Sequence, residues 1–441
     1  MPITVNEKQV VGIWQDYLQR RTDLKTVDNE PVRVIYPGRR NDDRGADFKD
    51  AIIDTKRGKS KGDIEIHVKT SYWWTHRHHL DPAYNRVILH VVYQHDTAET
   101  IALQNGLTIP TLALRDYVGG NNDHHEVLSI PCRGVGYQGD AGRLADRLDE
   151  AGETRFMVRA ESYEKMIVES GAGQALYQGI MTALGYSKNK DAMAELSRLI
   201  PLERLEALAS EEMSANEYLA RCQAYLMGAA GLLPSQRTGC LPGSDDIENW
   251  ETKLESIWSM GGIEARMSLK DWHLFKVRPS NYPVRRIAAM SHLLRHYRQK
   301  GLLAGLEERL KEAADADETN SLQEALSVPP DSYWGCHLDF GIPSSGVPSA
   351  LLGRERAADM VVNVVLPFFY IKGTPEYGKR VLKIYRGYRA SEENTLVKHM
   401  RQQVGVTRFL VDTARRQQGL MHIYKTRCSQ GKCGECRLGE Q

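Results

Sequence analysis

Two short segments, GADF at residues 45–48 and GDIEIHVK at residues 62–69, decide the fold of the N-terminal region. In the second segment isoleucine and valine alternate with polar residues, a period of two that is typical of a strand whose side chains point alternately to opposite faces. The apolar face is expected to pack into a core. The polar face carries Asp63, Glu65, His67 and Lys69. An acidic residue, Asp47, lies ahead of this strand, so we expect the region to carry a functional site.

The surrounding pattern predicts an α/β domain over residues 1–157. Apolar residues recur at helical spacing over residues 6–20, which predicts an amphipathic helix. Strands are predicted at residues 32–36, 47–55, 62–70, 86–93 and 108–114. A polar turn at Arg57-Gly58 joins the second and third of these strands into a hairpin, and the fourth is a nearly continuous apolar run interrupted by His90. A mixed sheet with flanking helices is therefore expected.

The remainder of the chain is predicted to be mainly helical. Helical periodicity dominates from about residue 158, so an α-helical domain is expected over residues 158–310. The polar stretch 311–332 is the best candidate for a linker, and residues 333–441 are predicted to form a basic helical C-terminal domain that ends in a cysteine cluster.

The composition is that of a soluble globular protein. Of 441 residues, 41% are hydrophobic and 26% are charged, and the apolar run 360–370 is too short to cross a bilayer. The N-terminus has no basic segment leading into an apolar stretch, so no secretory signal is expected. We therefore expect a cytoplasmic protein without a membrane partner.

Positive charge is concentrated near the C-terminus. Residues 372–437 contain fifteen Lys/Arg and five Asp/Glu, so this region carries +10 and the rest of the chain −9 of the total +1. Such asymmetry predicts contact with a polyanion, while solvated helix faces are the equally open alternative. The candidate nucleic-acid contacts are Arg415, Arg416, Lys425, Arg427 and Lys432.

The carboxylates of the hairpin predict a metal-dependent hydrolytic site. Asp47 and Glu65 could hold Mg²⁺ or Mn²⁺, because hard divalent ions take carboxylate ligands and can activate water beside a phosphate. Depending on the register of the hairpin, Asp47 could approach Glu65 or Lys69. Either Lys69 or His67 could then position the water or stabilise the reacting phosphate.

These residues resemble the PD-(D/E)XK nuclease superfamily, whose pattern is an Asp and then, after a hairpin, an acidic residue followed two positions later by Lys. The resemblance implies a nuclease-like fold and metal-dependent cleavage of DNA or RNA. In this chain Ala46-Asp47 stands in place of Pro-Asp, and His67 stands where the lysine is expected, with Lys69 two positions further. The lysine position therefore departs from the pattern of the superfamily.

A histidine-rich segment, WWTHRHHLD at residues 73–81, follows the strand. Its side chains could form a second metal set or supply an acid–base group to the first. A hydrogen-bonded loop over the sheet and stacking of its aromatic residues on bases are the open alternatives. The candidate auxiliary residues of the site are Asp63, His76, His78, Asp81 and His90.

The C-terminal spacing H-x5-C-x4-C-x2-C predicts a closed tetrahedral metal site. Its candidate ligands are His422, Cys428, Cys433 and Cys436. Zinc is expected there, with an iron–sulfur cluster or free thiols as alternatives. Some PD-(D/E)XK nucleases carry an iron–sulfur staple with one distant cysteine, and this resemblance implies that Cys132 or Cys336 would take the place of His422.

The combination of GADF, GDIEIH, the Trp/His segment and residues 278–283 (RPSNYP) is similar over nearly the full length to an uncharacterised bacterial family, DUF2851, to which no activity is attached. The function expected from the sequence is a divalent-metal-dependent nuclease. The alternatives are a catalytically inactive nucleic-acid-binding or scaffold protein with a nuclease-like fold, and a His/carboxylate metallohydrolase of a small molecule.

Overall fold

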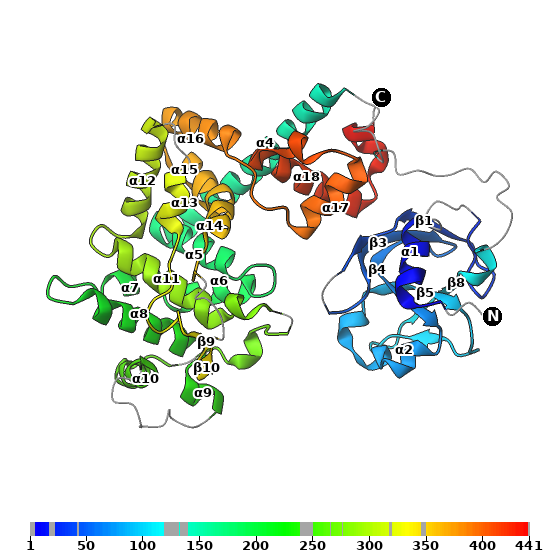
Figure 1. The fold of residues 1–441 in the computed structure, drawn as a ribbon, viewed down its shortest axis with the longest axis horizontal. Coiled ribbons are helices and arrows are strands. Elements are labelled where there is room, and N and C mark those ends of the chain that lie inside the picture. Colours follow the sequence, from blue (N-terminus) through cyan, green and yellow to red (C-terminus); the bar gives the residue numbers. More distant parts are fainter. Residues whose placement is uncertain are drawn as a thin grey trace. The chain divides into compact units, whose positions relative to one another are not determined.

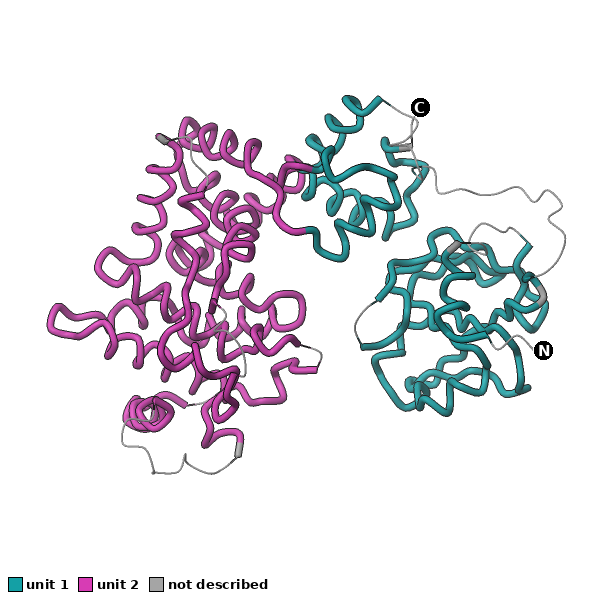
Figure 2. Tube along the Cα trace, viewed as in Figure 1, with its two compact units in different colours: residues 1–152, 393–411, 416–441 teal, residues 153–392, 412–415 magenta. Residues whose placement is uncertain are grey.

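The computed structural model divides the chain into two compact units (Figure 2). It describes residues 5–16, 23–41, 44–118, 132, 140–238, 250–264, 266–275, 277–316, 320–344 and 350–439. Unit 1 comprises residues 1–152, 393–411 and 416–441, and unit 2 comprises residues 153–392 and 412–415. The predicted C-terminal domain is thus divided, because its last helices share a hydrophobic cluster with the N-terminal sheet.

Unit 1 is built on a six-stranded mixed sheet (Figure 1). The strands are β1 (Val32–Tyr36), β2 (Arg39–Arg40), β3 (Phe48–Thr55), β4 (Gly58–Lys69), β5 (Val87–Gln94) and β8 (Thr111–Ala113). Their order is β1-β3-β4-β5-β8, with β2 also paired to β3. The pairs β1–β3 and β3–β4 are antiparallel, whereas β4–β5 and β5–β8 are parallel.

The predicted strand at residues 108–114 is split in two. Its first part, β7 (Thr108–Ile109), pairs with β6 (Ile101–Ala102) in a separate small sheet, and its second part is β8. Pro110 lies between the two parts and has no N–H to donate to a ladder, which accounts for the break.

One face of the sheet is covered by α1 (Glu7–Asp16). Val10 and Trp14 of this helix belong to the same buried cluster as Ile64 and Ile66 of β4. Full burial of each isoleucine side chain contributes about 1.5–3 kcal/mol. The predicted apolar face of β4 is therefore confirmed, and the predicted helix over residues 6–20 is described as far as Asp16.

The other face of β4 lies under the crossover to β5. This crossover contains α2 (Tyr72–Thr75), η2 (His78–Leu80) and η3 (Pro82–Tyr84). Pairing of β4 with β5 sets Glu65 opposite His90. The strand predicted at residues 86–93 thus lies between β4 and β8, a central position as its apolar sequence indicated.

The remainder of the chain is mostly helical. The helices that follow the sheet are α4 (Ala141–Ser170), α5 (Ala172–Leu184), α6 (Lys190–Leu199), α7 (Leu202–Glu206), α8 (Ala215–Ala229), α9 (Pro234–Thr238), α10 (Trp250–Met260), α11 (Pro283–Tyr297), α12 (Leu302–Ala316), α13 (Asn320–Leu326), α14 (Arg354–Met360), α15 (Leu366–Lys372), α16 (Pro375–Gly387), α17 (Thr395–Val404) and α18 (Ala414–Thr426). No helix among the described residues has the length and apolar character needed to span a membrane.

The stretch 311–332 does not have the character of a linker. Helix α12 extends into it and α13 lies within it, apart from residues 317–319, which lie outside the described residues. Leu322 and Leu326 are buried in the core of unit 2. The polar residues of this stretch are the solvent-facing side of amphipathic helices, which is why composition alone suggested a linker.

Candidate metal centre

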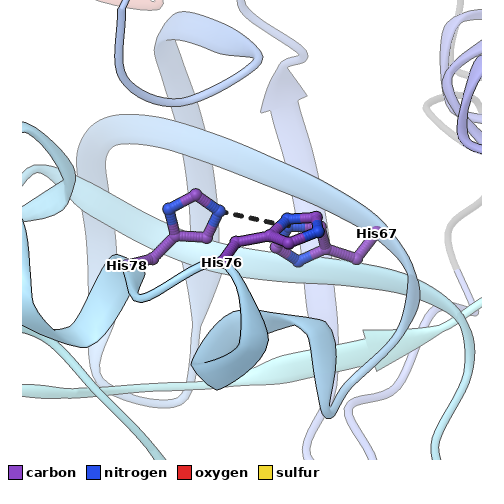
Figure 3. A group of neighbouring side chains, drawn as sticks. All are labelled: His67, His76 and His78. Atoms are coloured by element: carbon purple, nitrogen blue, oxygen red, sulfur yellow. Dashed lines mark hydrogen bonds between the residues drawn. The ribbon is translucent and has the colours of Figure 1, made fainter.

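Three imidazoles converge on the polar face of β4 (Figure 3). His67 lies on β4, His76 follows α2 and His78 begins η2. The Nε2 atom of His67 is 3.1 Å from Nδ1 of His76 and 3.2 Å from Nε2 of His78. Among the described residues, this is the one group of three or more His, Cys, Asp or Glu whose ligand atoms all lie within 4.8 Å of one another.

Glu65 places a carboxylate oxygen beside two of the three imidazoles. Its Oε1 atom is 3.4 Å from Nε2 of His67 and 3.3 Å from Nε2 of His78. A tetrahedral Zn²⁺ ion with bonds of about 2.0–2.1 Å sets its ligand atoms about 3.3–3.4 Å apart. The separations of His67 Nε2 from the nitrogens of His76 and His78, 3.1 and 3.2 Å, are close to this value. Glu65 is beside two of these imidazoles and is not a member of the group of three mutually close ligands.

A tight reversal of the chain aims His76 and His78 at the same point. Arg77 between them adopts a left-handed conformation, with φ of 61°. Trp73 fixes the segment, because its buried indole donates a hydrogen bond to the carbonyl of Ala102 and its ring packs 5.4 Å from that of His78. The histidine-rich segment is therefore a packed loop that also forms the candidate site.

Burial keeps the imidazoles of His67 and His78 neutral. It lowers the pKa of His67 to about 2 and that of His78 to about 4, and in both cases neighbouring imidazoles lower the pKa further. Burial also raises the pKa of Glu65 well above its usual range, with the nearby charge of Asp47 acting in the same direction. Neutral imidazoles offer lone pairs to a metal, and a cation would offset the cost of a buried carboxylate.

His90 is the partner of His67 behind the centre. Its Nε2 atom lies 2.9 Å from Nδ1 of His67, and both side chains are fully buried. If Nδ1 of His67 carries the proton and donates it to His90, Nε2 of His67 is left with its lone pair directed at the other imidazoles. A second hydrogen bond of this kind is how metal-ligating histidines are usually oriented.

Asp47 lies beside Glu65. The backbone N–H of Asp47 donates to Oε2 of Glu65 at 3.1 Å, and the N–H of Ile66 donates to Oδ2 of Asp47 at 3.1 Å. Burial raises the pKa of Asp47 to about 6. The hairpin thus brings Asp47 and Glu65 together. The other oxygen of Glu65, Oε1, faces the imidazoles of His67 and His78.

The other predicted residues of the site have separate partners. Lys69 is at the end of β4, where its charge lowers the pKa of Asp96. Asp63 is fully buried and accepts a hydrogen bond from Nζ of Lys49 at 2.8 Å. Asp81 accepts from the N–H of Ala83 and forms an ion pair with Arg44.

Two nearby cations, Lys49 and Arg44, were missing from the sequence-based set. The charge of Lys49 lowers the pKa of Glu65, so Lys49 of β3 is a cation close to that carboxylate. Lys49 stands two positions after Asp47, and the strand period could have identified it. Arg44 precedes the strand and had no periodic signal.

Several C-terminal basic residues have acidic partners within the chain. Arg427 is 2.7 Å and Lys432 is 3.9 Å from Glu435. The remaining ion pairs are Arg415 with Glu153 at 2.6 Å and Arg416 with Asp149 at 3.1 Å. Lys425 also has an interaction partner, and its backbone carbonyl accepts from Ser429. Four of these five candidate residues therefore form intramolecular ion pairs.

The predicted C-terminal metal ligands lie on α18 and the turns that follow it. His422 is within α18, where its carbonyl accepts a hydrogen bond from Thr426. Cys428 begins η9 (Cys428–Gln430), Cys433 begins η10 (Cys433–Glu435) and Cys436 follows directly. Cys132, from the N-terminal part of unit 1, lies in the same hydrophobic cluster as Cys428, and Cys436 packs against that cluster.

One family model matches the chain. Residues 7–394 match the family described as "Protein of unknown function (DUF2851)". The chain belongs to this family. No curated protein and no solved structure matches the chain. Membership of DUF2851 assigns no activity, so any functional conclusion rests on the geometry of the site.

Proposed function

We propose that this DUF2851 protein is a metal-dependent hydrolase whose metal ion is bound by His67, His76 and His78. The observation that carries the proposal is the convergence of their three ring nitrogens beside a buried carboxylate oxygen. Imidazole ligands suit Zn²⁺, Mn²⁺ or Fe²⁺ better than Mg²⁺. A divalent ion held there would supply Lewis-acid activation of a water molecule.

The proposal gives Glu65 the role of general base. Its Oε1 atom is beside two of the three nitrogens, and burial favours its uptake of a proton because it raises the pKa. Glu65 can therefore take the proton from the attacking water and return it to the leaving group. Asp47 holds Glu65 through its backbone N–H, so it is a positioning residue.

We propose a phosphodiester as the substrate. The order Asp47, hairpin, Glu65 matches the pattern shared with PD-(D/E)XK nucleases. Two exposed cations also belong to the loops around the centre. Arg77 lies between two of the histidines, and the half-exposed guanidinium of Arg44 is held by Asp81, which caps η3. Guanidinium groups bind phosphate oxygens and stabilise negative charge that develops on them.

Metal content and hydrolysis measured on the same variants test the proposal. The protein is stripped with a chelator and then titrated with Zn²⁺, Mn²⁺ or Mg²⁺. Cleavage of single- and double-stranded DNA, of RNA and of a chromogenic phosphodiester is followed for each metal. We expect His76→Ala to lose both binding at this centre and cleavage. Glu65→Gln should retain the ion and lose cleavage, and His95→Ala is the matched histidine control.

Each outcome has a defined meaning. Loss of the ion in Glu65→Gln to the same degree as in His76→Ala would make Glu65 a ligand and remove its role as base. Metal binding with no cleavage of any phosphodiester would refute the proposed substrate and favour a small-molecule hydrolase. Salt-sensitive binding of nucleic acid that needs no metal and yields no cleavage would refute the hydrolase itself.

A further inference from the structure

Four thiols from opposite ends of unit 1 come together in one place. Cys132 and Cys428 are buried, whereas Cys433 and Cys436 are half-buried. The side-chain amide of Gln403 lies between the first two, since its Nε2 atom donates to Sγ of Cys132 at 3.5 Å and to Sγ of Cys428 at 3.7 Å. Cys132 and Cys428 belong to one hydrophobic cluster and Cys436 packs against it, while Cys433 begins the turn that directly precedes Cys436.

Tight turns bring the three C-terminal thiols together. Gly431 has φ of 68°, and a side chain there would also crowd Ile52 of β3. Glycine adopts this conformation without strain and leaves room for Ile52. The N–H of Cys436 then donates to the carbonyl of Cys433 at 3.1 Å, closing the C-x2-C turn. The turns are thus packed on the sheet.

Packing brings three of the four thiols to one cluster. Cys132 and Cys428 share the amide of Gln403, and Cys436 packs against the hydrophobic cluster that contains both. Among the described residues no three of these sulfur atoms lie within 4.8 Å of one another. A single zinc ion would draw them to about 3.8 Å, whereas an iron–sulfur cluster is held by thiolates that stand further apart.

We propose that Cys132, Cys428, Cys433 and Cys436 bind a structural metal centre through four thiolates. The occupant is a zinc ion or an iron–sulfur cluster. Both bind thiolates, so in either case a soft metal replaces the protons of the thiols. The centre ties the chain at residue 132 to the C-terminal turns. It takes Cys132 as its fourth ligand in place of His422, and it is independent of the histidine centre.

The test is the metal content of the full-length protein purified without oxygen. A His67→Ala background removes the contribution of the histidine centre. We expect Cys132→Ser to lose the bound metal, and we expect His422→Ala and Cys222→Ser to retain it, the latter being a buried cysteine of α8 outside the cluster. Zinc gives a colourless protein with one ion, and a cluster gives iron, sulfide and visible absorbance.

If the Cys132→Ser protein fails to fold, a second measurement tests the proposal without that variant. A mercurial thiol reagent is titrated into the folded His67→Ala protein, and released metal is followed with an indicator. Release that needs modification of four thiols supports the proposal. No bound metal before titration, retention in Cys132→Ser, or loss in His422→Ala alone would overturn it, as would disulfides among the four cysteines in the protein purified without oxygen.

Discussion

Replacement of His90 isolates the role of the hydrogen bond behind the metal centre. When an ion occupies Nε2 of His67, the proton of that ring is on Nδ1 and needs an acceptor. His90 Nε2 is that acceptor, at 2.9 Å. The opposite arrangement, in which His90 donates, places the proton of His67 on Nε2 and blocks the ion. Removing the acceptor should therefore weaken metal binding without touching a ligand.

The expected loss of metal affinity follows from the burial of His67 and His90. Loss of such a partner usually costs 10–100-fold in metal affinity, or about 1.4–2.7 kcal/mol. Both rings are fully buried, so water cannot easily replace the acceptor. We expect His90→Leu to weaken metal binding about 100-fold, near the upper end of this range. His90→Gln should lose much less, because its amide oxygen can accept from Nδ1 of His67.

The assay is isothermal titration of the chelator-stripped protein with Zn²⁺ in the Cys132→Ser background, so that the thiols do not contribute. Circular dichroism of each stripped variant confirms that it is folded. His95→Ala provides a matched control, since His95 bonds to Thr70 rather than to a candidate ligand. An unchanged dissociation constant in His90→Leu would refute the orientation of His67, and equal losses in His90→Leu and His90→Gln would refute the argument from the acceptor.

Three further changes test the fold around the site. Asp63→Asn should lower the free energy of unfolding by about 3 kcal/mol in urea denaturation, because it leaves Lys49 without its buried carboxylate partner. Burial lowers the pKa of His399 to about 4, so the unfolded chain binds the proton first. Stability should fall by up to about 3 kcal/mol as pH falls from about 6.5 to about 4, and His399→Gln should reduce this slope. Gly62→Ala should cost about 1–3 kcal/mol and weaken metal binding, since its side chain would collide with the carbonyl of Arg86 ahead of β5.

Local patterns were sufficient for β4 and its two faces. Alternation in GDIEIHVK separated Ile64 and Ile66, which pack under α1, from Glu65 and His67, which face the crossover. The hairpin also placed Asp47 near this strand, but it left Glu65 and Lys69 as alternative neighbours, and the register of the structure selects Glu65. These features depend on neighbours in sequence, which periodicity reports directly.

The composition of the centre depends on contacts that periodicity does not report. The parallel register of β4 and β5 places His90 behind His67, and a single left-handed residue, Arg77, turns His78 back toward the strand. Neither is encoded by a repeating pattern. Lys69 was favoured by a family motif, although the structure provides Lys49 from the adjacent strand as the cation near Glu65.

The positions of the protons on the ring nitrogens distinguish a metal site from a purely hydrogen-bonded cluster. Without an ion, His76 and His78 can both direct an N–H at Nε2 of His67, which has one lone pair to offer two donors. With an ion, all three nitrogens must lack a proton, so the two rings change tautomer. The two states therefore require opposite proton positions on the same atoms. If the imidazole ¹⁵N shifts change when Zn²⁺ is added, the hydrogen-bonded arrangement is the ion-free state of a metal site. Unchanged shifts would mean that the histidine cluster only stabilises the loop.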